Sequence, residues 1–199
     1  MNDLVGLTRD LDLRLVEAAY RQGIFPMGAA EVQAVTWHRP DPRAIIPLDG
    51  FHVSRSLRKT LRQGRFETTC DRAFLEVMRG CAEREPTWIT ADFYRVYGEL
   101  HREGKAHSVE VWHAGRLVGG TYGVQMGAAF CAESKFHRMT DASKVALAGL
   151  VARLKERGFE LLEVQYLTPH LERFGAVEIS LAEYLKRLAK AGKKTCRFA

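Results

Sequence analysis

HSVEVWHAGRLVGGTYGVQMGAAFCAESKF, residues 107–136, is the stretch that decides the fold of this chain. Three short apolar runs follow one another in it, and the turn dipeptides Ala114-Gly115 and Met126-Gly127 separate them. Glycine-containing dipeptides between apolar runs are typical of tight hairpin turns. The stretch therefore predicts three antiparallel strands that are consecutive in the sheet.

A helix and one more strand are expected directly after these three strands. Between Asp141 and Arg157 the large apolar residues recur at helical spacing, and Gly158 provides a stop. The next run, FELLEVQYL at 159–167, has apolar residues on both faces and predicts a covered strand. Three strands, a crossover helix and a strand are also the order in acyltransferases of the GCN5-related N-acetyltransferase fold, an analogy of fold alone. We expect an α/β (α+β) protein with a mixed, mostly antiparallel sheet.

The first hundred residues predict a smaller α/β part. Three prolines in TWHRPDPRAIIP, residues 36–47, favour extended edge chain or loop there. We place a soft domain boundary near Gly104, which separates an N-terminal domain, 1–104, from an acetyltransferase-like domain, 105–199. The other elements expected from capping residues and apolar periodicity are a strand at 65–70 and helices at 13–22, 54–63, 71–82, 91–103, 169–175 and 181–190.

The composition favours a soluble globular protein. The chain has 199 residues with 46% apolar content, no apolar run long enough to span a membrane, and no signal-peptide pattern at its start. We therefore expect a cytoplasmic protein. The four cysteines lie far apart without a C-x-x-C pair, and the seven histidines show no metal-ligand spacing. These spacings argue against a disulfide framework and against a metal site.

The net charge of +6 is concentrated in two segments, 54–65 and 186–199, neither of which contains an acidic residue. In the first segment Ser54 is a capping residue, and the cations that follow it share one helical stripe. Concentrated positive charge predicts a polyanionic partner, most economically a nucleic-acid backbone. A plain solvated surface is the alternative for both segments. The cations of the stripe are Arg55, Arg58, Lys59 and Arg62.

Glu163 and Gln165 stand out as polar residues in the covered strand at 159–167. With a period of two, both would point to the same side, about 7 Å apart. A buried carboxylate must be paired, hydrogen-bonded, protonated or open to a cleft. Two interpretations remain open from the residues alone: a pair that ties strands together or bridges to an arginine, and a base with its orienting partner.

Other chemistry is poorly supported by the sequence. There is no G-x-S-x-G elbow for a serine nucleophile and no Cys-His signature. A CoA-dependent acetyltransferase would carry a glycine-rich pyrophosphate loop before its central helix, but ESKFHRMTDASK, residues 133–144, contains no glycine. Coenzyme A is therefore a poor fit as the acyl donor.

Eight ordered motifs resemble those of bacterial leucyl/phenylalanyl-tRNA–protein transferases, and the resemblance runs from about Asp12 to Tyr184. So many motifs in order are more specific than any single one. The motifs are AYRQGIFP (19–26), TWHRPDPRA (36–44), HVSRSLRK (52–59), TWIT (87–90), AHSVEVW (106–112), LVGGTYGV (117–124), FCAESKF (130–136) and DASKVAL (141–147).

The resemblance implies a reaction. The α-amine of a protein that begins with Arg or Lys attacks the aminoacyl ester at the 3′ end of a tRNA, which passes Leu or Phe to that protein. The product is marked for degradation by the N-degron route. Aminolysis of an activated ester needs no ATP, CoA or metal, so we expect no cofactor. The partners are then aminoacyl-tRNA and the acceptor protein, and we expect the enzyme to be a monomer without a membrane contact.

The resemblance also implies site residues. The family's Asp-x-Gln pair, held to activate the attacking amine, maps onto Glu163 and Gln165, with Glu as a departure from Asp. The basic stripe at 54–65 matches the family's tRNA acceptor-stem surface. Tyr20, Trp88 and Glu133 match the site for the terminal adenosine and aminoacyl group. The apolar pocket for the aminoacyl side chain maps onto Leu147, Leu150, Leu154 and Leu162, whose alternative interpretation is ordinary core.

Two further departures accompany the resemblance. Met27 stands where family members usually carry Trp, which removes an expected stacking surface. Family members also usually have a longer segment before the first helix, so we expect a trimmed N-terminal domain. Two rival functions follow from the same residues: a CoA-dependent small-molecule N-acyltransferase, and a tRNA-binding module that has lost catalysis.

Overall fold

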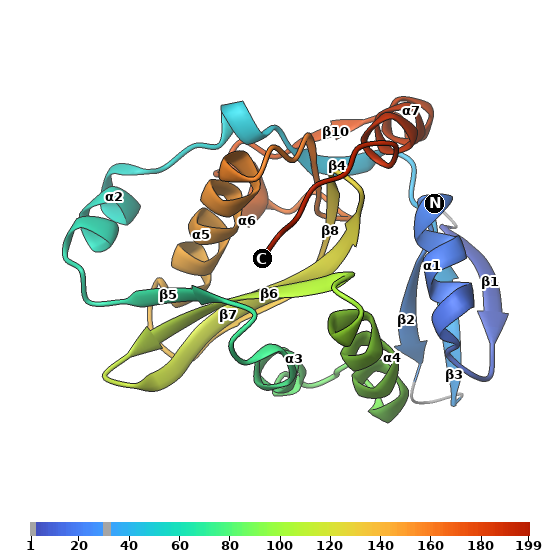
Figure 1. Cartoon of the computed structure of the whole chain (residues 1–199), viewed down its shortest axis with the longest axis horizontal. Coiled ribbons are helices and arrows are strands. Elements are labelled where there is room, and N and C mark those ends of the chain that lie inside the picture. Colours follow the sequence, from blue (N-terminus) through green and yellow to red (C-terminus); the bar gives the residue numbers. More distant parts are fainter. Residues whose placement is uncertain (1–2, 30–32) are drawn as a thin grey trace.

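The computed structural model of the protein describes residues 3–29 and 33–199. Its strands form two sheets, one three-stranded with the order β1-β3-β2 and one seven-stranded with the order β10-β4-β9-β8-β7-β6-β5 (Figure 1). The elements are β1 Leu4–Thr8, α1 Leu13–Arg21, β2 Phe25–Ala29, β3 Ala34–His38, β4 Arg43–Ile46, the 3-10 turn η2 Leu48–Gly50, α2 Arg55–Arg62, β5 Glu67–Cys70, α3 Phe74–Ala82, α4 Ala91–Arg102, β6 Ala106–His113, β7 Arg116–Met126, β8 Ala129–His137, α5 Ala142–Glu156, β9 Leu161–Glu163, α6 Pro169–Glu172, β10 Val177–Ile179 and α7 Leu181–Ala191.

The antiparallel strands expected from residues 107–136 are confirmed as β6, β7 and β8. Ala114 and Gly115 both have positive φ angles, 48° and 73°, as a two-residue hairpin turn requires. The second turn lies one residue later than expected, because Met126 pairs with Ala129 and the turn residues are Gly127 and Ala128. The mixed, mostly antiparallel sheet of an α/β protein is therefore confirmed.

The large sheet continues across the boundary expected near Gly104. Both β4 and β5 precede this residue, and both belong to the seven-stranded sheet. The expectation of edge chain or loop for 36–47 is wrong at β4, which lies between β10 and β9 with all four residues buried. The prolines explain the outcome, because Pro40, Pro42 and Pro47 flank the strand and none interrupts its hydrogen bonds.

The strand expected at 159–167 is shorter in the structure. β9 ends at Glu163, and Gln165 has a positive φ angle of 64°, which ends the extended conformation. Only three residues of β9 pair with β8, in parallel, and the last pair is Cys131 with Glu163. Glu163 and Gln165 are therefore not successive residues on one face of a strand, which corrects the period-two interpretation.

Helices cover both faces of the seven-stranded sheet (Figure 1). α5 packs on one face together with Leu57 of α2, while α3 and α4 pack on the other. α2 and the three-stranded sheet lie at opposite ends of the molecule. α3 begins at Phe74, later than the helix expected at 71–82, because the carboxylate of Asp71 accepts hydrogen bonds from Ser108 and His107. Within residues 3–29 and 33–199, no helix has the length and apolar character needed to cross a membrane.

Candidate functional site

A β-bulge in β8 places Glu133 at the opening between two strands. Ala132 pairs with Gly123 and Ser134 pairs with Tyr122, so Glu133 is the extra residue. A bulge bends the strand and re-aims its side chain. Past Cys131, β8 and β9 are no longer paired, and a small crevice of about 70 Å³ lies there, which we call the Glu133 crevice. Its lining residues are Thr121, Ala132, Glu133, Ser134, Lys135, Leu147, Val164, Gln165 and Leu171.

Glu133 is buried and held by hydrogen bonds to both carboxylate oxygens. The Tyr20 hydroxyl donates to Oε1 at 2.5 Å and lies 2.7 Å from the Tyr97 hydroxyl, while Gln165 Nε2 donates to Oε2 at 3.3 Å. Burial raises the pKa of Glu133 to about 8, although the Tyr20 hydrogen bond opposes the rise. In the described part of the chain no cation forms a salt bridge with Glu133. Its carboxyl group can therefore gain or lose a proton near neutral pH.

Glu163 is buried in a different way. Its carboxylate forms an ion pair with Arg43 at 2.9 Å, and each side chain is only 1% exposed. The guanidinium of Arg43 also lies over the rings of Phe25 and Tyr184, at 4.9 and 4.7 Å from their centroids. Burial raises the pKa of Glu163 and the Arg43 charge opposes that rise. The bridge to an arginine, which the sequence left open, is thus present in the structure.

Glu163 nevertheless contacts Gln165 through the main chain. The backbone N–H of Gln165 donates to Glu163 Oε1 at 2.5 Å, and the Gln165 side chain turns into the Glu133 crevice. Glu163 itself does not line the crevice. The two expected residues therefore lie together, with Gln165 open to a ligand and Glu163 behind it.

The residues expected to bind the aminoacyl group divide into two sets. Leu147 lines the Glu133 crevice, whereas Leu150, Leu154 and Leu162 are fully buried in the core under α5. Tyr20 contacts Glu133 directly. The structure brings only some of these residues to the crevice itself.

Trp88 is joined to the same site through aromatic contacts. Its ring packs edge-on against Phe93 at 5.2 Å, Phe93 stacks on Tyr97 at 5.6 Å, and Tyr97 shares a hydrogen bond with Tyr20. Tyr97 belongs to the helix predicted at 91–103, but the sequence gave no sign that its hydroxyl would reach Tyr20. The pairing of Arg43 with Glu163 was missed for the same reason, because the two residues are 120 positions apart in the sequence.

The four cations of the basic stripe lie on one exposed face of α2. Ser54 caps the helix as expected, because its side chain accepts a hydrogen bond from the Leu57 N–H. Leu57 and Thr60 are the buried residues of the helix. Within the described residues, none of the four cations takes part in a salt bridge. They surround a shallow depression of about 440 Å³, which we call the α2 basic face: Arg55, Arg58, Lys59 and Arg62, with Gln63 beside them.

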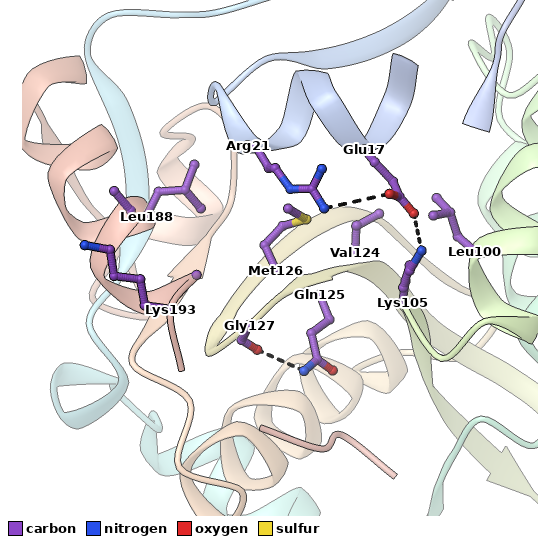
Figure 2. Close-up of a pocket in the computed structure, with 12 residues that line it drawn as sticks. Glu17, Arg21, Leu100, Lys105, Val124, Gln125, Met126, Gly127, Leu188 and Lys193 are labelled. Carbon is purple, nitrogen blue, oxygen red and sulfur yellow. Dashed lines mark hydrogen bonds and ion pairs between the residues drawn. The ribbon is translucent and has the colours of Figure 1, made fainter. Parts of the chain in front are cut away.

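A larger cavity of about 460 Å³ lies elsewhere, between α1, the β7–β8 turn and α7 (Figure 2). It shares no lining residue with the Glu133 crevice. Its charges are mostly paired already, because Glu17 forms salt bridges with Arg21 and Lys105. Gln125 donates to the carbonyl of Gly127 at 2.9 Å. This cavity therefore offers fewer free groups for chemistry than the crevice at Glu133.

Family models match nearly the whole chain. The model described as "Leucyl/phenylalanyl-tRNA protein transferase" matches residues 45–189, and that of its N-terminal domain matches residues 9–41. A protein named leucyl/phenylalanyl-tRNA–protein transferase from Herpetosiphon aurantiacus is 51% identical over 93% of this chain and 96% of its own length. One of the same name from Paramagnetospirillum magneticum is 52% identical over 96% of this chain and 92% of its own.

A solved structure with partial similarity is a GCN5-related N-acetyltransferase-like protein from Streptococcus suis. It is 17% identical, and the comparison covers 84% of this chain and 64% of that one, with a TM-score of 0.45. Conclusions about function therefore rest on the sequence matches and not on this structural similarity.

Proposed function

The chain belongs to the leucyl/phenylalanyl-tRNA–protein transferase family, and from this premise we propose that it moves Leu or Phe to the N-terminal Arg or Lys of acceptor proteins. Family membership makes it an aminoacyl-tRNA–protein transferase, with aminoacyl-tRNA and a protein as substrates. The choice of acceptor, the N-degron role, the cytoplasmic location and the monomeric state are parts of the proposal. The observation that supports its mechanism is the contact between Glu133 and Gln165 in a crevice.

The proposed reaction is an aminolysis. The α-nitrogen of the acceptor forms a bond with the carbonyl carbon of the ester, and the bond from that carbon to the 3′ oxygen of the tRNA breaks. One proton leaves the nitrogen, and one proton must reach the departing oxygen. The protein therefore has to position two substrates and carry a single proton.

Gln165 is suited to position the attacking amine. Its Nε2 donates to Glu133, and its backbone N–H is held by Glu163, so both ends of the residue are fixed. This leaves the amide oxygen, which has no hydrogen-bond partner among the described residues, to accept an N–H from the amine. A fixed acceptor of this kind aligns the nitrogen lone pair with the ester carbon.

Glu133 is suited to carry the proton. Its pKa of about 8 lies near neutral pH, which favours a group that first takes and then returns a proton. In the proposed step its carboxylate takes the proton from the amine and delivers it to the 3′ oxygen. Tyr20 holds one carboxylate oxygen, which leaves the oxygen facing Gln165 for this exchange.

The α2 basic face is the proposed docking surface for the tRNA backbone. Its cations are exposed and unpaired within the described residues, so they can contact phosphates without breaking internal salt bridges. Release of condensed counterions makes such binding strongly salt-dependent.

Transfer from charged tRNA to peptides tests the proposal. Wild-type protein is expected to join Leu and Phe to a peptide that begins with Arg, and Gln165→Ala should slow this transfer by about 10²-fold because the amine is no longer aligned. Gln22→Ala, at an exposed position at the end of α1, is the matched control and should transfer normally. Near-normal transfer by folded Gln165→Ala would disprove the positioning role.

Two further measurements separate the rival functions. Tight acetyl-CoA binding in a calorimetric titration would favour a CoA-dependent N-acyltransferase. Salt-dependent tRNA binding without any product would indicate a binding module, and an Arg58→Gln/Arg62→Gln variant should bind tRNA more weakly and with a flatter salt dependence.

A further inference from the structure

Lys135 lies two residues after Glu133 on β8, at a distance of roughly 7 Å along the strand. It pairs with Thr121 of β7, and both residues line the Glu133 crevice with Gln165. The lysine is therefore next to the groups that are proposed to act on the aminoacyl ester.

Lys135 is half-buried and has no ionic partner among the described residues. Burial lowers its pKa, and the charge of Arg84 lowers it further. Burial of a charged lysine without a counter-ion costs free energy, because the ammonium group loses its hydration. An anionic ligand at this position would offset that cost.

Neighbouring basic residues add to the positive charge around Lys135. Arg84 donates to the hydroxyl of Ser134 at 3.3 Å. The charge of Lys135 also acts on His170 of α6, whose pKa is lowered by burial and by the charges of Lys135, Lys144 and Arg173. Lys144 is paired with Asp141 at 2.8 Å, but neither Arg84 nor Arg173 has a carboxylate partner within the described residues. Lys135 is the cation among the residues that line the crevice, and the neighbouring charges add to the positive potential around it, which favours an anion.

We propose that Lys135 binds the phosphate on the 5′ side of the terminal nucleotide of aminoacyl-tRNA. This inference rests on the transfer reaction proposed above. The ester and that phosphate are attached to the same ribose, so a ligand with its ester at Glu133 and Gln165 brings the phosphate within reach of a neighbouring strand residue. Every charged tRNA carries this phosphate, whatever its amino acid. The alternative anion, an acidic first residue of the acceptor, is absent from acceptors that begin with Arg or Lys.

The test uses a stable phenylalanyl-adenosine, in which an amide replaces the ester, with and without a 5′-phosphate. Calorimetric titration of wild-type protein is expected to show roughly tenfold tighter binding of the phosphorylated compound, as for a hydrogen bond to a charged group. Lys135→Met should lose this preference while it binds the unphosphorylated compound as before. Lys135→Arg should retain part of the preference. Lys190→Met, which removes an exposed cation of α7, should keep all of it.

Three results would overturn the inference. They are an unchanged phosphate preference in Lys135→Met, equal binding of both compounds by wild-type protein, and no binding of either compound. Transfer by wild-type protein from intact charged tRNA is measured in parallel. If that transfer is normal while the phosphate preference is missing, the inference fails and the proposed function stands.

Discussion

Two buried carboxylates, Glu133 on the bulge of β8 and Glu163 at the end of β9, lie on either side of Gln165 and differ in what surrounds them. Glu163 has a fully buried arginine as its partner, at 2.9 Å. Glu133 has two neutral donors, a tyrosine hydroxyl and the Gln165 amide. An adjacent cation stabilises the ionised form of a buried acid, whereas neutral donors compensate only part of the desolvation cost.

This difference in partners indicates which acid stabilises the fold and which is able to exchange a proton with a ligand. Glu163 holds Arg43 and the backbone of Gln165, so its charge is committed to the fold. Glu133 has a pKa of about 8 and lines the crevice, so it can exchange a proton with a ligand. The family resemblance mapped the active acid onto Glu163. The partners of each carboxylate favour Glu133.

The largest expected effect comes from removing Arg43. Arg43→Met keeps an apolar side chain between Phe25 and Tyr184 but leaves the Glu163 carboxylate buried without a counter-ion. We expect a loss of about 3–5 kcal/mol in the free energy of unfolding, measured by urea denaturation at neutral pH.

The double variant Arg43→Met/Glu163→Gln serves as the control, since it removes both charges and should recover most of the lost stability. If Arg43→Met fails to fold, a stable double variant still supports the pairing. A cost below about 1 kcal/mol for Arg43→Met would contradict a committed ion pair, because surface pairs cost that little.

The next effect concerns the proton transfer proposed for Glu133. Glu133→Gln keeps the shape of the side chain but cannot carry a proton, so transfer from charged tRNA should fall by about 10²-fold. Glu163→Gln retains an oxygen that can accept from the Gln165 backbone, and its activity per folded molecule should fall by less than about tenfold.

The pH profile separates these variants further. Wild-type transfer should rise with pH through the pKa of Glu133, near 8, as the carboxylate becomes ionised. The acceptor α-amine titrates in the same range, so the same peptide is used for all proteins and its contribution is common to them. An identical profile in wild-type protein and Glu133→Gln would show that Glu133 does not carry the proton.

The elements that were predicted correctly from the sequence are those that depend on residues close to one another in the chain. Strands β6 to β8 follow from apolar runs and turn glycines, α2 begins after the expected cap Ser54, and α7 begins at Leu181 as expected. In each case the deciding residues are near one another in the chain. Local patterns of this kind fix secondary structure before any long-range contact is known.

The features that the sequence did not predict depend on remote partners. Arg43 and Glu163 are 120 residues apart, and Tyr20 and Glu133 are 113 apart, so no local pattern shows that they meet. The same reason applies to β4, whose flanking prolines suggested a loop until its two neighbouring strands were known. Gln165 was expected in a strand because its neighbours are apolar, but its positive φ angle turns the side chain into the crevice.

The last expected effect is on the pH dependence of stability. The pKa of Glu133 is raised from 4.5 to about 8 in the folded protein, so between these values the folded state holds a proton that the unfolded state has lost. This proton stabilises the fold fully below pH 4.5, and the contribution disappears as the pH rises through 8. The slope in this window is at most about 1.4 kcal/mol per pH unit.

Glu133→Gln should remove this slope, because the amide does not titrate, and should therefore become the more stable protein as the pH approaches 8. Urea denaturation of both proteins at several pH values between 5 and 8 measures the difference, in which groups common to both cancel. Two parallel stability curves would mean that Glu133 is ionised throughout, like a carboxylate paired with a cation. The contrast with Glu163 would then be lost, and the proton carrier would have to be sought among the substrates themselves.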